Sequence, residues 1–269
     1  MNSRNLLVCV EGLESRMMLA GHPVIFGGVT PSSVTAKIVG SDVQITGDSL
    51  ANTIVITPVG TSGTTIRIAG LSGTTINGHA SATLNGVDDI NIQMGDGNDN
   101  VAVTNLPISG NLVIWPGNGN DTTTLNGVAV GKKLTVRDHL GNDIVVLLNV
   151  AVKDKTRLST GGDADTINID DSTFSGAVQI KGGAGNDNVQ IERLGSATGK
   201  ATTFQQDVSM GFADGNDLLD IGVSGQSGNH AIFKKKADWD GGRGNSDFET
   251  RSNATFIAGQ PTIRRWEIS

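Results

Sequence analysis

Six aspartates recur at nearly constant spacing through the middle of this chain. The first four steps between them are 22 residues long and the last is 30. The six are Asp99, Asp121, Asp143, Asp165, Asp187 and Asp217. On stacked repeats their carboxylates would lie about 5 Å apart and repel by roughly 3 kcal/mol per pair at an effective dielectric of about 20. A bridging divalent cation reverses the sign of that interaction, so the six aspartates are candidate metal ligands.

Each aspartate closes a short turn that reads G-x-G-N-D with local exceptions. An asparagine stands directly before it at Asn98, Asn120, Asn142, Asn186 and Asn216. Glycines whose carbonyls could add metal ligands stand two and four residues before it at Gly95, Gly97, Gly117, Gly119, Gly183 and Gly185. The Asn column is expected to form a structural ladder, in which each side chain hydrogen-bonds the next coil. In an alternative interpretation Asn and Asp are turn formers only, and Asp faces water and salt.

Strand-like alternation flanks every turn and predicts the elements that position it. Apolar pairs such as Ile90 and Ile92 precede the turn, and pairs such as Val101 and Val103 follow it. A period of two is that of a β-strand, and a fixed repeat of about 22 residues indicates a solenoid. The predicted fold class is all-β: a single-domain right-handed parallel β-helix with about 22 residues per coil and eight or nine coils. Its handedness is expected from chain chirality.

The repeat also predicts how the chain is divided. Residues 1–20 are expected to be a targeting or sorting segment, 21–40 an N-terminal cap, 41–247 the β-helix and 248–269 a C-terminal cap. Asn52 takes the Asp position in an early coil, and residues 60–85 are interpreted as one degenerate coil. Ser246 is expected to take the Asp position in the last coil.

Composition argues against several classes of function. The net charge of −7 and the pI near 5.0 argue against nucleic acid as a partner. Cys9 is the only cysteine, so disulfides cannot staple the repeats. No apolar stretch is long enough for a membrane helix, so no transmembrane segment is expected.

An enzyme is not expected. An Asp column supplies carboxylates everywhere, so their presence does not identify the acid–base pair of a glycosidase. Arg137, Asp138 and His139 form the one compact cluster that a lyase could use, and a polar turn explains them better. A polysaccharide lyase or hydrolase is the alternative function, and a metal-free structural solenoid is a third.

Two resemblances point to calcium and to the cell exterior. Residues 182–189 read G-G-A-G-N-D-N-V, which resembles the RTX nonapeptide of secreted bacterial proteins. That resemblance implies Ca²⁺ held between stacked turns by Asp side chains and turn carbonyls, although RTX rolls have two such turns per coil and this chain has one. Residues 13–20, L-E-S-R-M-M-L-A, resemble the LEPR-XLL segment of planctomycete surface and secreted proteins. Together these resemblances imply an extracellular or cell-surface location and a structural or adhesive role. Glycans, envelope or matrix components, or further copies of the chain would be the partners.

Overall fold

The computed structural model describes residues 16–19, 22–25, 31–61, 63–193, 199–223, 230–243, 247–265 and 267–268. The chain divides into two units, Met1–Pro31 and Ser32–Ser269. In the first unit β1 (Arg16–Leu19) pairs antiparallel with β2 (His22–Ile25), and the rest of the expected targeting segment lies outside the described residues. Across the described ranges, no helix is long and apolar enough to cross a membrane.

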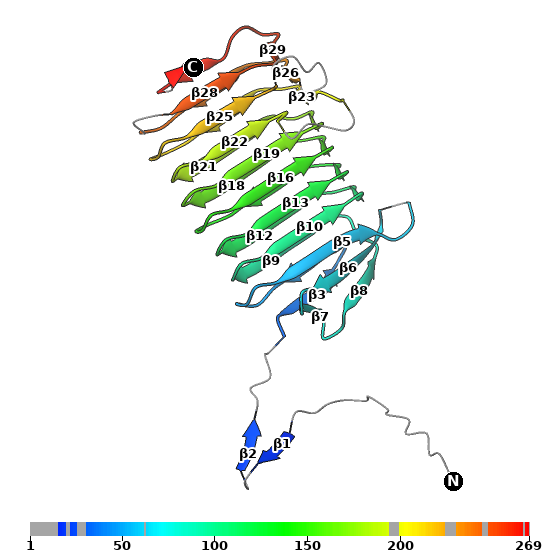
Figure 1. Cartoon of the computed structure of the whole chain (residues 1–269). Coiled ribbons are helices and arrows are strands. Elements are labelled where there is room, and N and C mark those ends of the chain that lie inside the picture. The colour runs from blue at the N-terminus through cyan, green and yellow to red at the C-terminus, as the bar shows by residue number, and fades with distance from the viewer. Residues whose placement is uncertain are drawn as a thin grey trace, which may run out of the picture. The chain divides into compact units, whose positions relative to one another are not determined.

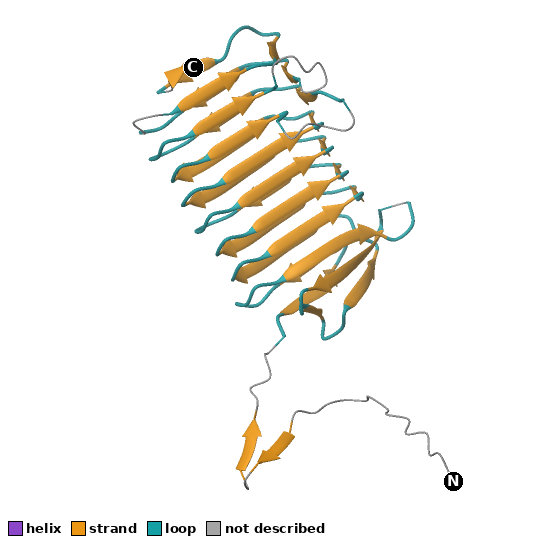
Figure 2. Cartoon of the chain, viewed as in Figure 1, coloured by secondary structure: helices purple, strands orange, loops and turns teal. Residues whose placement is uncertain are grey.

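Strands of the second unit wind through three long parallel sheets (Figures 1 and 2). Sheet 1 contains β4 (Asp42–Thr46), β9 (Ile90–Asp96), β12 (Leu112–Asn118), β15 (Leu134–Arg137), β18 (Thr156–Gly162), β21 (Val178–Ala184), β24 (Val208–Gly211), β27 (Ala237–Asp240) and β30 (Thr262–Arg264). Sheet 2 contains β5 (Thr53–Pro58), β10 (Asn100–Thr104), β13 (Thr122–Asn126), β16 (Ile144–Leu148), β19 (Thr166–Asp170), β22 (Asn188–Ile191), β25 (Leu218–Ile221), β28 (Phe248–Arg251) and β31 (Glu267–Ile268). Sheet 3 contains β11 (Pro107–Ile108), β14 (Ala129–Val130), β17 (Ala151–Val152), β20 (Thr173–Phe174), β23 (Thr202–Phe204), β26 (Ala231–Phe233) and β29 (Ala254–Phe256).

In each sheet a strand pairs in parallel with the equivalent strand of the next repeat. Val101 is paired with Thr123, and Thr123 with Val145, which are steps of one repeat. One strand from each sheet makes one coil, and consecutive coils are neighbours in space. The all-β architecture of long parallel sheets that the repeat predicted is therefore confirmed.

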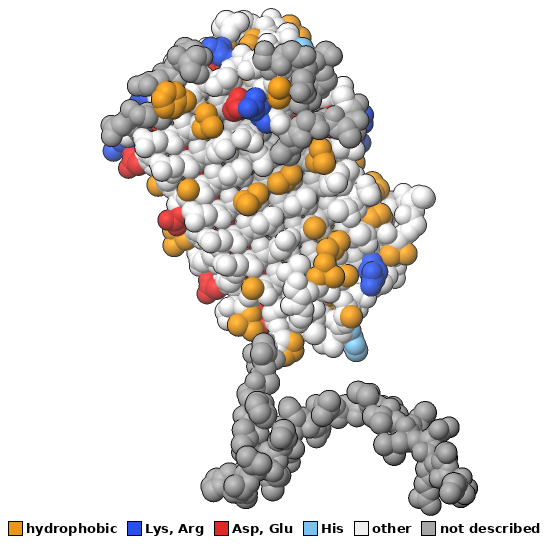
Figure 3. All heavy atoms as spheres, in the orientation of Figure 1, with side chains coloured by type: hydrophobic (Ala, Val, Ile, Leu, Met, Phe, Trp, Pro, Cys, Tyr) orange, Lys and Arg blue, Asp and Glu red, His pale blue; other side chains and the backbone are white. Residues whose placement is uncertain are grey.

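Side chains alternate between the interior and the surface along these strands, as the period of two predicts. Ile90 and Ile92 of sheet 1 and Val101 and Val103 of sheet 2 are all buried. Beside sheet 3 a stack of aromatic rings fills the core, with centroids 5.3, 4.7 and 4.8 Å apart. The stack is formed by Phe174, Phe204, Phe233 and Phe256. The outer face of sheet 2 carries few charged side chains (Figure 3).

The segment between the first two coils differs from the prediction. β6 (Thr65–Leu71) pairs antiparallel with both β5 and β8 (Ser81–Asn85), and β7 (Thr75–Ile76) pairs with β3 (Ser33–Val39). The degenerate coil expected over residues 60–85 is therefore wrong, because alternation identifies strands without giving their direction. Together with β3, which runs antiparallel to β4, these strands cover the edge of the first coil. An uncovered edge would be open to pairing with another chain.

The coils also continue past residue 247, where a separate cap was expected. β28 and β29 pair in parallel with β25 of sheet 2 and β26 of sheet 3. β30 then extends sheet 1 and β31 extends sheet 2. The Asp position of this coil is occupied by Asp247, whose Oδ1 accepts the N–H of Asp217 at 2.9 Å. Ser246, which was expected there, lies outside the described residues. The step from Asp217 to Asp247 is 30 residues, longer than the 22-residue repeat. The repeat length therefore does not fix the Asp position here, and the expected position was one residue too early.

Candidate metal centre

The Asp column lies at the turn between sheets 1 and 2 and forms a ladder of hydrogen bonds. The backbone N–H of each Asp donates to Oδ1 of the Asp on the following coil, beginning with Asp99 and Asp121 at 2.6 Å. The next four steps repeat this bond at 2.8–3.0 Å. Asn52 begins the column as predicted, and its N–H donates to Asp99 Oδ1 at 2.7 Å.

The Asn column forms a second ladder with the opposite direction. Asn98 Oδ1 accepts the backbone N–H of Asn120, and Asn120 Oδ1 accepts that of Asn142, each at 2.9 Å. Asn142 accepts from Ala164 in the same way, and Asn186 accepts from Asn216. These asparagines are exposed, whereas the neighbouring aspartates are buried. The turn therefore has an amide ladder on its outer side and a carboxyl ladder on its inner side.

The turn glycines bring successive coils into close contact. Gly95, Gly97, Gly117, Gly119, Gly183 and Gly185 have φ between 107° and 131°, a region that side chains rarely adopt. A Cβ on Gly117 would also overlap the carbonyl oxygen of Gly95, and one on Gly119 would overlap that of Gly97. The turn carbonyls thus point along the stack toward the next coil.

The six predicted aspartates do not face water. They are only 1–2% exposed, so the interpretation in which they are solvated turn formers is wrong. Oδ2 of each is buried and receives no hydrogen bond. Burial raises the pKa of Asp99, Asp143 and Asp187 to about 7, and neighbouring aspartates add to the rise. These three carboxyls of the ladder therefore titrate near neutral pH.

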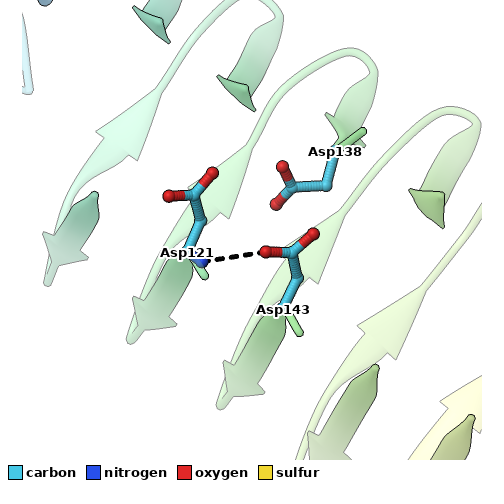
Figure 4. Close-up of side chains that lie close together, drawn as sticks. All are labelled: Asp121, Asp138 and Asp143. Carbon is cyan, nitrogen blue, oxygen red and sulfur yellow. Dashed lines mark hydrogen bonds between the residues drawn. The ribbon is translucent and has the colours of Figure 1, made fainter. Parts of the chain in front are cut away.

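Two of these aspartates meet a third carboxylate inside the coil (Figure 4). Asp121 and Asp143 project inward from consecutive turns, and Asp138 projects toward them from the residue that follows β15. One oxygen of each lies within 4.8 Å of the other two. Asp138 is 4% exposed, and its Oδ1 accepts the N–H groups of Gly117 and His139 at 3.2 Å each.

The three carboxyls cannot all be ionised without a counter-charge. Two charges no more than 4.8 Å apart repel by at least about 3.5 kcal/mol at an effective dielectric of about 20. Burial first, and then the charges of Asp143 and Asp121, raise the pKa of Asp138 to about 9. Burial likewise raises the pKa of Asp121, and the hydrogen bond that its Oδ1 accepts from the Asp99 N–H opposes that rise. The cluster thus needs either a shared proton or a cation.

The geometry fits a metal ion. For an ion whose oxygen ligands lie at about 2.4 Å, two ligands can be at most about 4.8 Å apart. With all three carboxylates ionised, Oδ2 of Asp121 and Oδ2 of Asp143 have no donor, and both are buried. An unsatisfied buried carboxylate oxygen is costly unless it binds a cation or a proton. This cluster could therefore hold a metal ion.

The sequence pointed to Asp121 and Asp143 but missed Asp138 as their partner. Asp138 lies five residues before Asp143, in an inward-facing column. The same position in other coils is taken by Met94, Pro116, Thr160, Gly182 and Phe212. One acidic residue in a column of otherwise uncharged residues was the available signal. Asp99, Asp165, Asp187 and Asp217 stay in the ladder and do not join this cluster.

Asp138 does not form the lyase-like cluster that its neighbours in the sequence suggested. Arg137 is exposed on the outer face of sheet 1, whereas Asp138 is buried inside the coil. His139 is exposed in the turn. Arg137 and Asp138 therefore lie on opposite sides of the chain and do not converge on one substrate site.

Comparisons with known proteins name no relative. No family model, no curated protein and no solved structure matches this chain.

Proposed function

We propose that this chain is a secreted or surface-associated structural protein with an adhesive role, whose right-handed β-helix is tightened by Ca²⁺. The observation that carries this proposal is the Asp121–Asp138–Asp143 cluster, with its two buried carboxylate oxygens that receive no hydrogen bond. The RTX-like turn and the LEPR-XLL-like segment support calcium and an extracellular or cell-surface location. A rigid stack of coils with flat outer faces suits a spacer or an adhesive surface.

Calcium is the cation that best suits three buried carboxylates. Zn²⁺ prefers thiolate and imidazole ligands, and the cluster contains neither. Mg²⁺ requires near-octahedral geometry and usually keeps several waters, which a buried site hardly accommodates. Ca²⁺ tolerates irregular oxygen coordination and commonly binds extracellular modules at about 10⁻⁴–10⁻³ M. Folding would then be completed after export, because a cation that binds only the folded chain stabilises it.

The number of ions per chain tests this proposal directly. Metal-stripped protein is dialysed against Ca²⁺ at rising concentration, and the bound ion is counted. We expect one ion per chain, which Asp138→Asn abolishes and Asp187→Asn leaves in place. Asp187 is the matched control, because it occupies the same ladder but lies outside the cluster.

The other stoichiometries have distinct meanings. About six ions per chain, reduced by either substitution, would mean that calcium binds along the whole Asp ladder and its turn carbonyls and not at the cluster alone. No bound ion at millimolar Ca²⁺ would contradict a calcium site and leave a metal-free structural solenoid.

A further inference from the structure

The outer face of sheet 1 carries a group of cations in an otherwise acidic protein. Five basic residues point outward on or beside β15, β18 and β21, and Trp115 of the neighbouring strand β12 is 40% exposed. The five are Lys133, Arg137, Lys155, Arg157 and Lys181. We name these six residues the cationic face. The chain as a whole has a net charge of −7, so this clustering is a local feature.

The register of the sheet places these side chains next to one another. Thr135 pairs with Arg157, and Arg137 pairs with Ser159, which in turn pairs with Lys181. Trp115 follows Ile114, which pairs with Val136, so Trp115 lies beside Arg137. Four strands at about 4.8 Å spacing and four residues at about 3.3 Å rise give an area of about 14 by 13 Å. A rigid array of this size contacts several units of an extended polymer.

The charges of the cationic face are not neutralised by neighbouring side chains. The outward positions of β12, β15, β18 and β21 contain no Asp or Glu. The ion pairs of the described chain lie elsewhere and involve none of the five cations. At the C-terminal end of sheet 1, by contrast, Arg264 of β30 forms ion pairs with Asp238 and Asp240 of β27. Unpaired cations in fixed positions indicate a surface for an anionic ligand.

We propose that the cationic face binds a linear acidic polysaccharide, one that carries carboxylate or sulfate groups. Arg137 and Arg157 can each bind such a group through two parallel hydrogen bonds, and the lysines act as point charges. Trp115 supplies an exposed ring for the apolar face of a sugar. This inference rests on the adhesive role proposed above and names the partner class for it.

Nucleic acid fits this face less well. Double-stranded DNA presents one charge per about 1.7 Å of its axis, so tight binding draws on many cations along a curved backbone. The cationic face is flat and ends within a few strands, where Asp89 and Asp207 border it at the starts of β9 and β24. A polysaccharide with one acid group every one or two sugars has a sparser charge that matches the five cations better.

Binding to defined polymers tests the proposal. Polygalacturonate and dextran sulfate are the acidic probes, with neutral dextran and duplex DNA for comparison, all in chelator at low ionic strength. The test variant is Arg137→Gln/Arg157→Gln/Lys181→Gln. The control variant, Lys37→Gln/Lys234→Gln/Lys235→Gln, changes the net charge equally at exposed positions outside the face. Melting curves verify that both variants are folded, which is expected because all six side chains point outward.

We expect at least one acidic polysaccharide to bind, with an affinity that falls as salt is added. The test variant should lose about tenfold or more in affinity, because three exposed ion pairs contribute about 0.5 kcal/mol each, and the control should lose far less. Equal losses in the two variants, equal binding of neutral dextran, or no binding of either acidic probe would overturn the proposal. Tighter binding of DNA would assign the face to nucleic acid instead. None of these results depends on calcium, so the count of bound ions still tests the structural proposal separately.

Discussion

Replacing Asp138 by asparagine should stabilise the metal-free protein and abolish its response to calcium. The carboxyl of Asp138 must be protonated when it is buried without a cation, and its pKa rises from 3.8 to about 9. Holding that proton at pH 7 costs about 4 kcal/mol, from the gap of roughly three pH units above the ordinary pKa at 1.36 kcal/mol each. Asparagine keeps the oxygen that accepts from Gly117 and His139, and its NH₂ can donate to Asp121 or Asp143.

Calcium should narrow or close this gap in stability. At a concentration 100 times the dissociation constant, a cation that binds only the folded chain adds about 2.7 kcal/mol. For a chain of this size that corresponds to roughly 5–10 °C in melting temperature. We therefore expect Asp138→Asn to melt above the wild type in chelator, and the wild type to gain most or all of that difference in calcium.

The pH dependence isolates the contribution of this carboxyl. Its folded pKa lies above its unfolded value, so the folded state binds the proton more tightly, and metal-free stability falls as pH rises from about 4 to about 9. The assay is chemical denaturation in chelator at pH 6, 7 and 8, where the wild-type free energy of unfolding should fall more steeply than that of the variant. The difference should approach about 1.4 kcal/mol per pH unit. Two results would refute the reasoning that these carboxyls lack a counter-charge: a variant less stable than the wild type at pH 8, or a free energy of unfolding that changes with pH equally in both proteins.

Further predictions concern the ladder, the turns and the core. Metal-free protein should have a higher melting temperature at pH 5 than at pH 8, because burial raises the pKa values of the ladder carboxyls to about 6–7. Gly119→Ala should cost about 2 kcal/mol or more in denaturant unfolding, whereas Gly40→Ala, where a Cβ meets nothing within 4 Å, should cost less. Phe204→Ala should cost about 3–5 kcal/mol in the same assay, because the ring is fully buried and stacked on both sides. Asn142→Ala should cost only about 1 kcal/mol, since water can replace its exposed amide as the acceptor.

The stacking of the coils could be predicted from the sequence, because equal spacing places equivalent residues next to one another. Val101, Thr123 and Val145 occupy the same column in the sequence and are paired in the sheet. The antiparallel strands over residues 65–85 could not be predicted in this way. Their alternation is the same as in a coil, and strand direction depends on turns whose residues follow no repeat.

The direction in which the Asp side chains point could not be predicted from the sequence either. Turn residues do not follow the period of two, so alternation cannot tell which of two neighbours points inward. Asn98 and Asp99 are adjacent, yet the first is exposed and the second is 2% exposed. The position of the last Asp was missed because the loops before it lengthen its step to 30 residues.

The choice of aspartate over asparagine in the inner ladder has a physical reason. Either side chain can accept the backbone N–H, as Asn52 Oδ1 does from Asp48 at 3.1 Å. An asparagine there must also satisfy its NH₂, and that of Asn52 donates to Asp48 Oδ1 at 3.1 Å. An aspartate has no such donor, and its second oxygen can remain against the core at the cost of a raised pKa.

The residue five positions before each ladder aspartate then decides what that second oxygen meets. Met94 and Phe212 put buried apolar side chains at this position, and Thr160 donates its hydroxyl to the Gly182 carbonyl at 2.9 Å. At Asp138 the neighbour is another carboxyl, so a uniform structural ladder acquires one position with ligand chemistry. Moving that single acidic residue to the equivalent position of another coil, with Asp138→Thr and Thr160→Asp together, should move the metal site by one coil and leave the ladder unchanged.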